Sequence, residues 1–247
     1  MTNTQADDWD ALARLDPFWA ICSRREKRGG GWSLDEFFAT GEAEIAGVLA
    51  RPEAQPARFE KALDVGCGAG RTARALAKRF ATCCGVDASE EMIELGRRLN
   101  ADLPNCVLVH DTAWLDRFEP ESADFVYSAF VLQHLGTRED VLRGIRELVR
   151  VARADGAIVF QLPEPLPLRR RLQPRRRLYR GLRRLGARED RLYRLGLHPV
   201  SMIGLERNAV EAALTAAGAE VALVEQVDPE HSLGGLRYYV RRTRRSL

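Results

Sequence analysis

The sequence predicts an α/β fold with a mostly parallel, doubly wound sheet that helices cover on both faces. Five short apolar runs are predicted strands, near residues 61–66, 82–87, 106–110, 124–129 and 156–162. Helical patterns lie between them, near 70–80, 89–100 and 138–152. Regular alternation of strands and helices is typical of parallel sheets, because each parallel connection must cross back over the sheet. A helix near 205–217 and two strand-like runs, 219–227 and 236–243, complete the pattern.

Residues 1–58 show helical patterns and no strand pattern, so we predict an N-terminal helical cap on a main domain of residues 59–247. Ser33 and Glu36 form a capping box that starts one of these helices. The cap is rich in aromatic side chains, namely Trp9, Phe18, Trp19, Trp32, Phe37 and Phe38. They either close over a ligand as a lid, with Trp9 and Trp19 as its members, or pack the extra helices on the sheet.

A glycine-rich turn follows the first predicted strand and opens a helix: Asp64-Val65-Gly66-Cys67-Gly68-Ala69-Gly70-Arg71. Glycine lets the backbone approach a ligand that any Cβ would push away. Asp87 ends the next predicted strand, where its carboxylate can accept hydrogen bonds from both hydroxyls of a ribose. A strand, a glycine turn, a helix and a second strand that ends in an acid together predict a nucleoside-binding βαβ unit.

The position of Asp64 argues against a dinucleotide. A carboxylate at this place would repel a pyrophosphate, and the glycines follow G-x-G-x-G rather than G-x-G-x-x-G. A ligand with a nucleoside and a nearby positive charge fits better, and S-adenosylmethionine has an adenosine, a sulfonium and an α-ammonium group. These residues resemble motif I of the class I S-adenosylmethionine-dependent methyltransferases. The alternatives are an NAD site or a glycine turn in another α/β fold.

The resemblance covers about residues 60–243. It implies a seven-stranded Rossmann-like sheet whose last strand runs antiparallel, S-adenosylmethionine as cofactor and S-adenosylhomocysteine as product. The implied cofactor contacts are Asp64, Gly66, Cys67, Gly68, Gly70 and Arg71 at the methionine end, Asp87 at the ribose, Ala88 and Asp111 with Thr112 at the adenine, and Ser128 and Phe130 on the floor. Asp111 has a second interpretation as a residue of a simple strand-end turn. Methyl transfer from a sulfonium is a direct displacement, so no metal is expected.

His134 is the candidate catalytic residue, because it follows the fourth predicted strand, where the resemblance implies a histidine near the sulfonium. An unperturbed histidine pKa near 6.5 suits a general base or a group that orients the acceptor. The competing interpretation is a histidine that packs the wall of the site. His110, His198 and His231 are weaker candidates.

The net charge of +3 hides a strongly basic segment within a predicted insertion at residues 163–200. Residues 169–194 hold twelve arginines against only Glu189 and Asp190. Leu178, Leu182 and Leu185 recur there at helical spacing. Four interpretations stay open: a cap helix that grips an anionic substrate, RNA binding, attachment to an anionic membrane surface, or a cationic face that is solvated or paired with acidic groups of this chain or a second subunit.

The five cysteines form no C-x-x-C pair and are expected to be free thiols rather than zinc ligands. No apolar run approaches the roughly 18 residues of a membrane span, and the polar start of the chain does not suggest a signal peptide, so we expect a cytoplasmic enzyme. We predict methyl transfer to an oxygen or nitrogen of a small acceptor, such as a natural product, sugar or metabolite, with an anionic group as one option. The alternatives are an RNA or membrane-surface lipid methyltransferase and a non-catalytic S-adenosylmethionine-binding partner protein.

Overall fold

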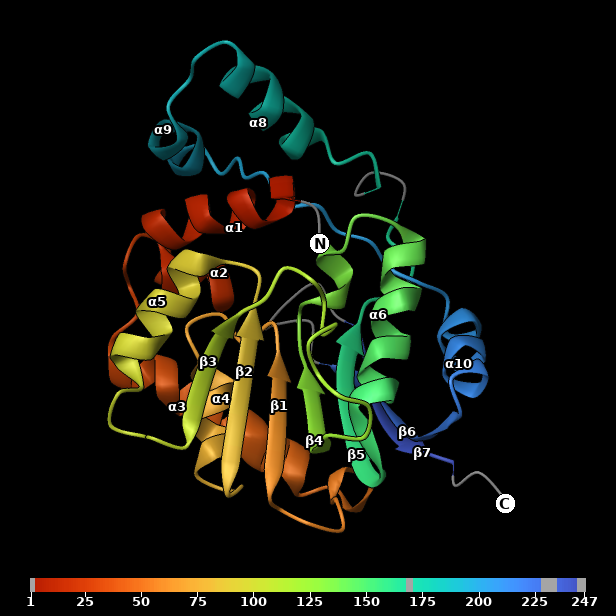
Figure 1. Cartoon of the computed structure of the whole chain (residues 1–247). Helices are drawn as coiled ribbons and strands as arrows, with labels where there is room; N and C mark the ends of the chain where they lie inside the picture. Colours follow the sequence, from red (N-terminus) through yellow and green to blue (C-terminus); the bar gives the residue numbers. More distant parts are fainter. Residues whose placement is uncertain (1–2, 168–170, 228–234, 244–247) are drawn as a thin grey trace.

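A seven-stranded sheet organises the protein in the computed structural model, which describes residues 3–167, 171–227 and 235–243 (Figure 1). The strands lie in the order β3-β2-β1-β4-β5-β7-β6. Their bounds are β1 Lys61–Val65, β2 Thr82–Asp87, β3 Cys106–His110, β4 Ala123–Ser128, β5 Ala152–Leu162, β6 Ala219–Val227 and β7 Gly235–Arg242. Strands β1 to β5 are parallel, and β7 runs antiparallel to both β5 and β6. The predicted sheet, with its antiparallel last strand, is confirmed.

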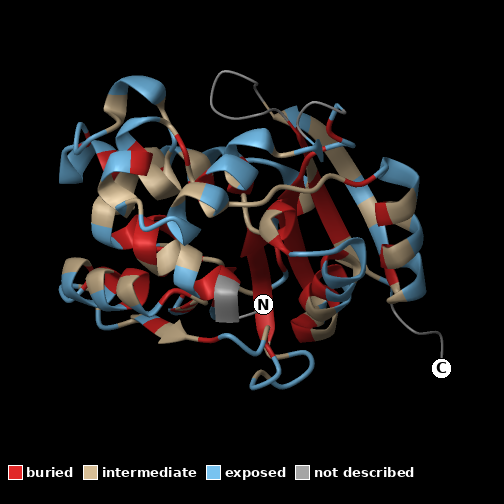
Figure 2. Ribbon diagram, turned by 90° about the horizontal axis from the view of Figure 1, so that it is seen from above, coloured by how far each residue is buried: buried red, intermediate tan, exposed pale blue. Residues whose placement is uncertain are grey.

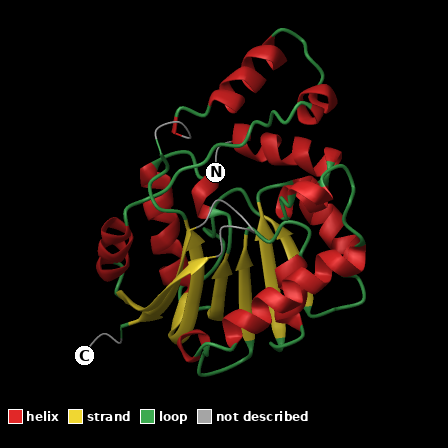
Figure 3. Ribbon diagram, turned by 180° about the vertical axis from the view of Figure 1, so that it is seen from behind, coloured by secondary structure: helices red, strands yellow, loops and turns green. Residues whose placement is uncertain are grey.

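Helices cover both faces of this sheet, as Figure 3 shows from behind. On one face lie α3 (Leu34–Leu49), α4 (Arg71–Ala77) and α5 (Glu90–Leu99), and on the other α6 (Arg138–Val151) and α10 (Arg207–Ala216). The remaining helices are α1 (Asn3–Leu15), α2 (Pro17–Ile21), α8 (Pro174–Arg184), α9 (Glu189–Arg194) and the short 3-10 turns η1 (Arg25–Lys27), η2 (Pro52–Ala54) and η3 (Leu132–His134). No helix in the described part of the chain combines the length and apolar character that crossing a bilayer requires.

Alternation along the strands produces two apolar layers, one on each face. In β1, Leu63 and Val65 pack with α6 and α10, whereas Ala62 packs with α3 and α4. Phe125 of β4 is fully buried on the α3 side, and Val126 on the α6 side. Such continuous burial is expected for central parallel strands covered on both sides. Figure 2 shows the buried residues concentrated in these strands and the exposed ones on the outer helices.

The N-terminal residues form two parts that lie at different places on the sheet. The predicted capping box is present at the start of α3, where Glu36 N–H donates to Ser33 Oγ at 3.2 Å. Helix α3 packs closely on α4, since a Cβ added at Gly41 would overlap the carbonyl of Arg71. It therefore covers a face of the sheet. Of the predicted cap at 1–58, α1 and α2 lie over the ends of the strands (Figure 1).

The insertion after β5 rests on the N-terminal helices. In Figure 1, α8 and α9 lie above α1. The Tyr193 hydroxyl donates to Asp16 Oδ2 at 2.7 Å, and Arg28 stacks on the Tyr193 ring with 4.2 Å between its guanidinium carbon and the ring centre. Arg180 of α8 pairs with Asp8 of α1 at 3.6 Å. The N-terminal helices and the insertion thus form one continuous cover.

Candidate active site

A cavity of about 1280 Å³ opens at the carboxyl ends of β1, β2 and β4. The strand order reverses between β1 and β4, and open α/β sheets bind ligands at such a switch point. The N-terminal helices line the cavity from above, and His198, Val200 and Met202 line it from the end of the insertion. Because ligand pockets commonly measure about 300–1,000 Å³, this cavity has room for a cofactor and a second molecule.

The glycine turn forms one wall of the cavity. Gly66 and Gly68 have φ values of 77° and 53°, which favour glycine. A Cβ at Gly66 would overlap Val131, and one at Gly68 would lie 2.7 Å from Ile21. Both glycines and Cys67 between them line the cavity. Gly70, which was predicted to contact the cofactor, instead faces Asn100 and Leu108 outside the cavity, where it supplies the left-handed residue that starts α4.

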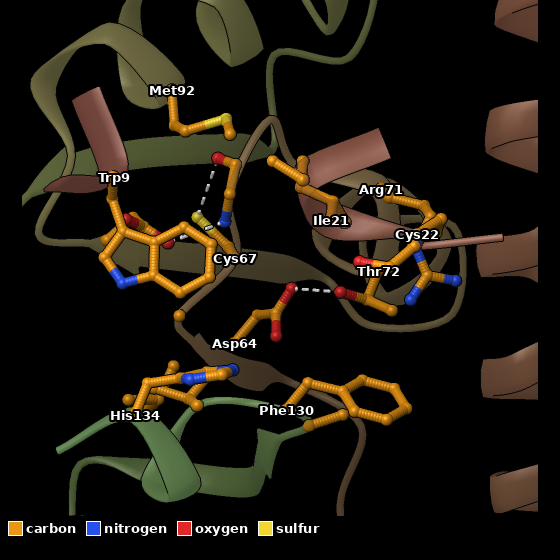
Figure 4. Close-up of a pocket in the computed structure, with 18 of the residues that line it drawn as sticks. Trp9, Ile21, Cys22, Asp64, Cys67, Arg71, Thr72, Met92, Phe130 and His134 are labelled. Carbon is orange, nitrogen blue, oxygen red and sulfur yellow. Dashed lines mark hydrogen bonds between the residues drawn. The ribbon is translucent and has the colours of Figure 1, made fainter. Parts of the chain in front are cut away.

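Asp64 is a buried acid at the centre of the site, with only 2% of its surface exposed. Its Oδ2 accepts a hydrogen bond of 2.7 Å from the Thr72 hydroxyl. Figure 4 shows this bond, with Trp9 and His134 on the other side of the carboxylate. Burial raises the pKa of Asp64 to about 7, because its effect outweighs the hydrogen bond from Thr72, which lowers that pKa. A cation in the cavity would stabilise the ionised form.

Asp87 and Ala88 line the cavity beside the glycine turn. The Asp87 carboxylate accepts hydrogen bonds from Gly68 N–H at 2.8 Å and Ser89 N–H at 2.9 Å. One bond fixes each oxygen, so the remaining lone pairs are available to a ligand. Burial raises the pKa of Asp87, because its effect outweighs these backbone hydrogen bonds, which lower that pKa.

Asp111 and Thr112 line the next part of the cavity, beyond β3. Asp111 accepts hydrogen bonds of 3.0 Å from the N–H groups of Ala113 and Leu115. This acid thus shapes a strand-end turn and also faces the cavity, and a contact with adenine stays a prediction.

The end of β4 corrects one prediction. Ser128, predicted on the cofactor floor, is fully buried, donates to the Val65 carbonyl at 3.0 Å and does not line the cavity. Its hydroxyl ties β4 to β1 instead. Ala129 and Phe130 do line the cavity, and Phe130 has a φ of 62°, a conformation that is strained for a bulky residue.

His134 lines the cavity with its ring edge-on to Trp9, at a centroid distance of 5.1 Å. Its Nδ1 lies 2.7 Å from the Ser201 carbonyl, which can only accept, so Nδ1 carries the proton. Its Nε2 lies 3.3 Å from the amide nitrogen of Gln133. Burial lowers the pKa of His134 to about 4. The imidazole is therefore neutral at physiological pH and well anchored, which favours a wall or orienting role over a strong base.

The aromatic residues of the N-terminal segment separate into two groups. Trp9, Trp19 and Trp32 line the cavity, and the Trp19 Nε1–H donates to the Arg24 carbonyl at 3.0 Å. Phe37 is fully buried in a small apolar cluster beside α4, where Phe18 and Phe38 pack against it. Trp9 thus lines the cavity outside this cluster, whereas Trp19 and Trp32 both line the cavity and pack with the phenylalanines.

Arg71 was named from the sequence, but the polar cluster that it forms on the cavity wall was not predicted. Arg71 donates to Glu44 Oε2 at 2.6 Å, and the Tyr127 hydroxyl donates to Glu44 Oε1 at 2.6 Å. Arg237 of β7 lies 3.4 Å from the same oxygen. Burial would raise the pKa of Glu44, but Arg71 and Tyr127 outweigh it and hold that pKa below its usual value. Two guanidinium groups and one carboxylate leave this cluster with a net positive charge.

The other histidines and the cysteines add little to the site. His110 contacts the Ala88 carbonyl at 3.1 Å, His198 lines the cavity, and His231 lies outside the described residues. All five cysteines are free thiols. The described residues contain no group of three or more His, Cys, Asp or Glu side chains arranged to hold a metal ion.

Comparison with known proteins agrees with this geometry. Residues 63–160 match a family model described as a methyltransferase domain. Demethylmenaquinone methyltransferase of Staphylococcus aureus is 37% identical over 102 residues, which are 40% of this chain and 41% of that protein. The chain thus spans about two fifths of the length of the curated relatives it matches.

Solved structures share the fold over nearly the whole chain. Magnesium protoporphyrin IX methyltransferase of Synechocystis, solved with bound S-adenosylmethionine, has a TM-score of 0.59 at 16% identity, over 95% of this chain and 97% of that one. A putative methyltransferase of Haloferax volcanii, in complex with the Trm112 methyltransferase activator, has a TM-score of 0.64 at 16% identity, over 100% of both chains.

The match to the methyltransferase-domain model covers residues 63–160, and the seven-stranded sheet that contains them has the Rossmann-like fold of class I S-adenosylmethionine-dependent methyltransferases. The segment that matches the family model runs from β1 to β5 and carries Asp64, Asp87 and Asp111.

Proposed function

We propose that this chain transfers the methyl group of S-adenosylmethionine to an oxygen or nitrogen of a small or medium-sized acceptor. The observation that carries the proposal is the arrangement of three acids around one cavity. Asp64 lies beside the glycine turn, Asp87 at the tip of β2 and Asp111 beyond β3. Their order matches a ligand that presents a positive charge, then a ribose, then an adenine.

The residues fit this cofactor chemically. Asp64 is buried without an ion pair among the described residues, so its carboxylate suits the ammonium and sulfonium charges. Asp87 keeps lone pairs for the two ribose hydroxyls. The bare backbone at Gly66 and Gly68 lets the ligand lie close to the turn. When bound, S-adenosylmethionine supplies a methyl group on a good leaving group.

The chain's own contribution to the reaction is alignment and exclusion of water. Placing the acceptor atom in line with the methyl carbon and the sulfur can supply several kcal/mol of the barrier. The tryptophans of the cover, Trp9, Trp19 and Trp32, close the cavity from above. The Nε2 lone pair of the neutral His134 already faces the amide of Gln133, so the anchored ring would orient an acceptor by packing against it, with Gln133 beside it on the cavity wall.

The rest of the cavity supports an acceptor with an apolar body. Trp114, Phe130, Val200 and Met202 line it, and one relative over part of the chain is named for demethylmenaquinone. An anionic group is supported by the positive cluster around Arg71 and Arg237, which lines the same cavity. Among the described residues, none of the arginines at 171–194 lines the cavity, so a grip by that segment on the acceptor is not supported.

The test is product formation with purified protein. S-adenosylmethionine labelled in its methyl group would be incubated with a panel of aromatic hydroxyl, carboxylate and amine acceptors, and both labelled product and S-adenosylhomocysteine would be quantified. We expect stoichiometric formation of the two with at least one acceptor class. Tight S-adenosylhomocysteine binding without any product across the panel would favour the non-catalytic binding protein.

A further inference from the structure

The insertion exposes leucines to an unusual degree. Leu172, Leu178, Leu185 and Leu195 are 48%, 53%, 84% and 73% exposed. The other strongly exposed large apolar residues of the described chain, Leu34, Phe59 and Val107, are scattered over other elements. Isolated apolar side chains on a surface need no explanation, but a group of them on one segment commonly marks an interaction site.

Helix α8 exposes two leucines on its outer side. Leu178 and Leu185 are seven residues apart and therefore lie on the same side of the helix. Gly181 lies between them, and nothing comes within 4 Å of the position of a Cβ there. The inward side is held by Tyr179, which is buried against Leu192 and Leu197, and by Leu182, which packs on the same cluster. An ordinary surface helix is apolar only toward the core, whereas α8 also has leucines on its outer side.

Three arginines of α8 have no partner within the described chain. Arg175, Arg177 and Arg184 are exposed and form neither an ion pair nor a side-chain hydrogen bond there. Five other arginines of the segment have partners within the chain. Arg176 donates to the Pro199 carbonyl, Arg180 pairs with Asp8, Arg183 with Glu189, and Arg188 and Arg194 with Asp190. Arg171 and Arg191 are likewise exposed without such a partner among the described residues, so the free charges of the segment include those beside Leu178 and Leu185.

We propose that the outer face of α8, which consists of Arg175, Arg177, Leu178, Arg184 and Leu185, docks on the surface of an anionic phospholipid bilayer. Leucines flanked by arginines match the boundary between acyl chains and negative headgroups. RNA would use the arginines but would leave the leucines in water. Single-stranded nucleic acid also stacks on aromatic rings, and the tyrosines of this segment, Tyr179 and Tyr193, are buried.

Docking through this face would bring the cover of the cavity to the bilayer. Tyr193 of α9 is bonded to Asp16 beside the N-terminal helices, and His198 and Met202 of the following segment line the cavity. The proposal goes beyond the methyl transfer, because a protein without any catalytic activity would dock in the same way.

The test is sedimentation of the full chain with vesicles of phosphatidylcholine alone or with roughly one-third phosphatidylglycerol. We expect binding only to the anionic vesicles. Arg175→Gln, Arg177→Gln and Arg184→Gln together should lower the partition coefficient roughly 100-fold, since each charge near such a surface contributes about a five-fold factor. Leu178→Ser with Leu185→Ser should lower it about 10-fold or more while the charge stays the same.

Matched controls separate docking from general effects. Arg98→Gln, Arg138→Gln and Arg146→Gln remove three exposed arginines elsewhere, and Leu34→Ser with Val107→Ser removes two exposed apolar side chains elsewhere. Both controls should bind vesicles like the wild type. Circular dichroism and S-adenosylhomocysteine affinity show that each variant is folded, because none of these residues lines the cavity.

Three results would overturn the proposal. The first is a folded wild type that does not bind anionic vesicles. The second is a leucine variant that binds them like the wild type. The third is binding to single-stranded RNA that falls in the arginine variant and is unchanged in the leucine variant, which would assign the face to nucleic acid. Concentration-dependent dimers that vanish in the leucine variant, without vesicle binding, would assign it to a second copy of this chain.

Discussion

The buried carboxylate of Asp64 accepts a hydrogen bond of 2.7 Å from the hydroxyl of Thr72, eight residues further along the chain. No basic side chain among the described residues forms an ion pair with it. Thr72 is a neutral donor on α4, so it orients the carboxylate without neutralising it. The site therefore holds an acid whose charge a cationic ligand would balance.

Cofactor affinity should rise with pH through the pKa of Asp64, which burial raises to about 7. Below that pH the acid is protonated and cannot attract the ammonium group of S-adenosylhomocysteine. Calorimetric titration between about pH 5.5 and 8 should show an increase in the wild type. Asp64→Asn should bind weakly and without this increase. The ligand's own amino group loses its charge at higher pH, and the resulting loss of affinity should be the same in both proteins. If affinity depended on pH in the same way in the wild type and in Asp64→Asn, Asp64 would not be the acid that binds the ammonium group.

The same pKa has the opposite effect on the stability of the ligand-free protein. The native state keeps the Asp64 proton up to about pH 7, whereas the unfolded chain releases it near the ordinary aspartate pKa of 3.8. The native state thus binds more protons between these values, and the free energy of unfolding should fall as pH rises from about 4 to 7. Urea denaturation of wild type and Asp64→Asn measures this. The difference between the two should become constant above pH 7.

Asp87→Asn should weaken S-adenosylhomocysteine binding about 100-fold, or on the order of 3 kcal/mol, because charge-assisted bonds to both ribose hydroxyls are lost. The amide keeps the shape of the side chain but has one acceptor oxygen, so it can keep the bond from Gly68 or from Ser89 and loses the other, and circular dichroism must show that the variant is folded. Asp116→Asn, at an exposed ion pair with Arg143, is the matched control and should bind like the wild type. Equal affinities of the two variants would rule out a ribose contact by Asp87.

His134→Ala should lower turnover about 10²-fold with little change in cofactor affinity, because an acceptor is no longer oriented. Since burial lowers the pKa of His134 to about 4, its ring does not titrate near neutral pH. His134→Asn should recover part of the rate and keep the shape of the kcat–pH profile. A wild-type profile that loses a step near pH 6.5 in His134→Asn would instead show a general base.

Gly66→Ala should destabilise the protein by about 2–4 kcal/mol, from the left-handed backbone and the overlap with Val131. Gly181→Ala is the control, because α8 leaves open space there, and it should stabilise by about 0.5–1 kcal/mol. Midpoints of urea denaturation compare the two. A Gly66→Ala protein as stable as the wild type would mean that the turn differs from the one described.

Tyr193→Phe should loosen the cover, since it removes the buried hydrogen bond to Asp16. Such a bond to a charged group contributes about 1.5 kcal/mol, so the melting temperature should fall by roughly 3–6 °C. Tyr238→Phe is the control, because its hydroxyl makes no hydrogen bond within the described residues. Calorimetric melting curves that shift equally for both variants would contradict a specific contact.

The strands and helices of the core were predictable because their patterns are local. Apolar runs bounded by glycine or acids placed most strand ends within one or two residues. The start of β5 was missed: it begins at Ala152, not 156, because β4 and β5 pair with an irregular register between Ala123 and Phe125. Such a shift depends on the partner strand, and a single strand's sequence does not encode it.

The site was predictable where residues follow one another along the chain and not where distant segments meet. Asp64, Gly66 and Asp87 share one motif and one wall. Glu44 and Arg237 are 193 residues apart, and only the fold brings them together. Ser128 does not line the cavity as predicted, because the alternation of side chains along a strand does not tell which face of its last residue meets a cavity. For the same reason, the spacing of the leucines in α8 did not reveal that Leu178 and Leu185 face outward.

Binding of S-adenosylhomocysteine to the unmodified protein tests the central claim most directly. Isothermal titration calorimetry at about pH 8, where Asp64 is ionised, should give a dissociation constant in the micromolar range, about −8 kcal/mol, with one site per chain. NADH under the same conditions should give no heat, because its pyrophosphate would meet Asp64. Binding of NADH in the absence of S-adenosylhomocysteine binding would contradict the account.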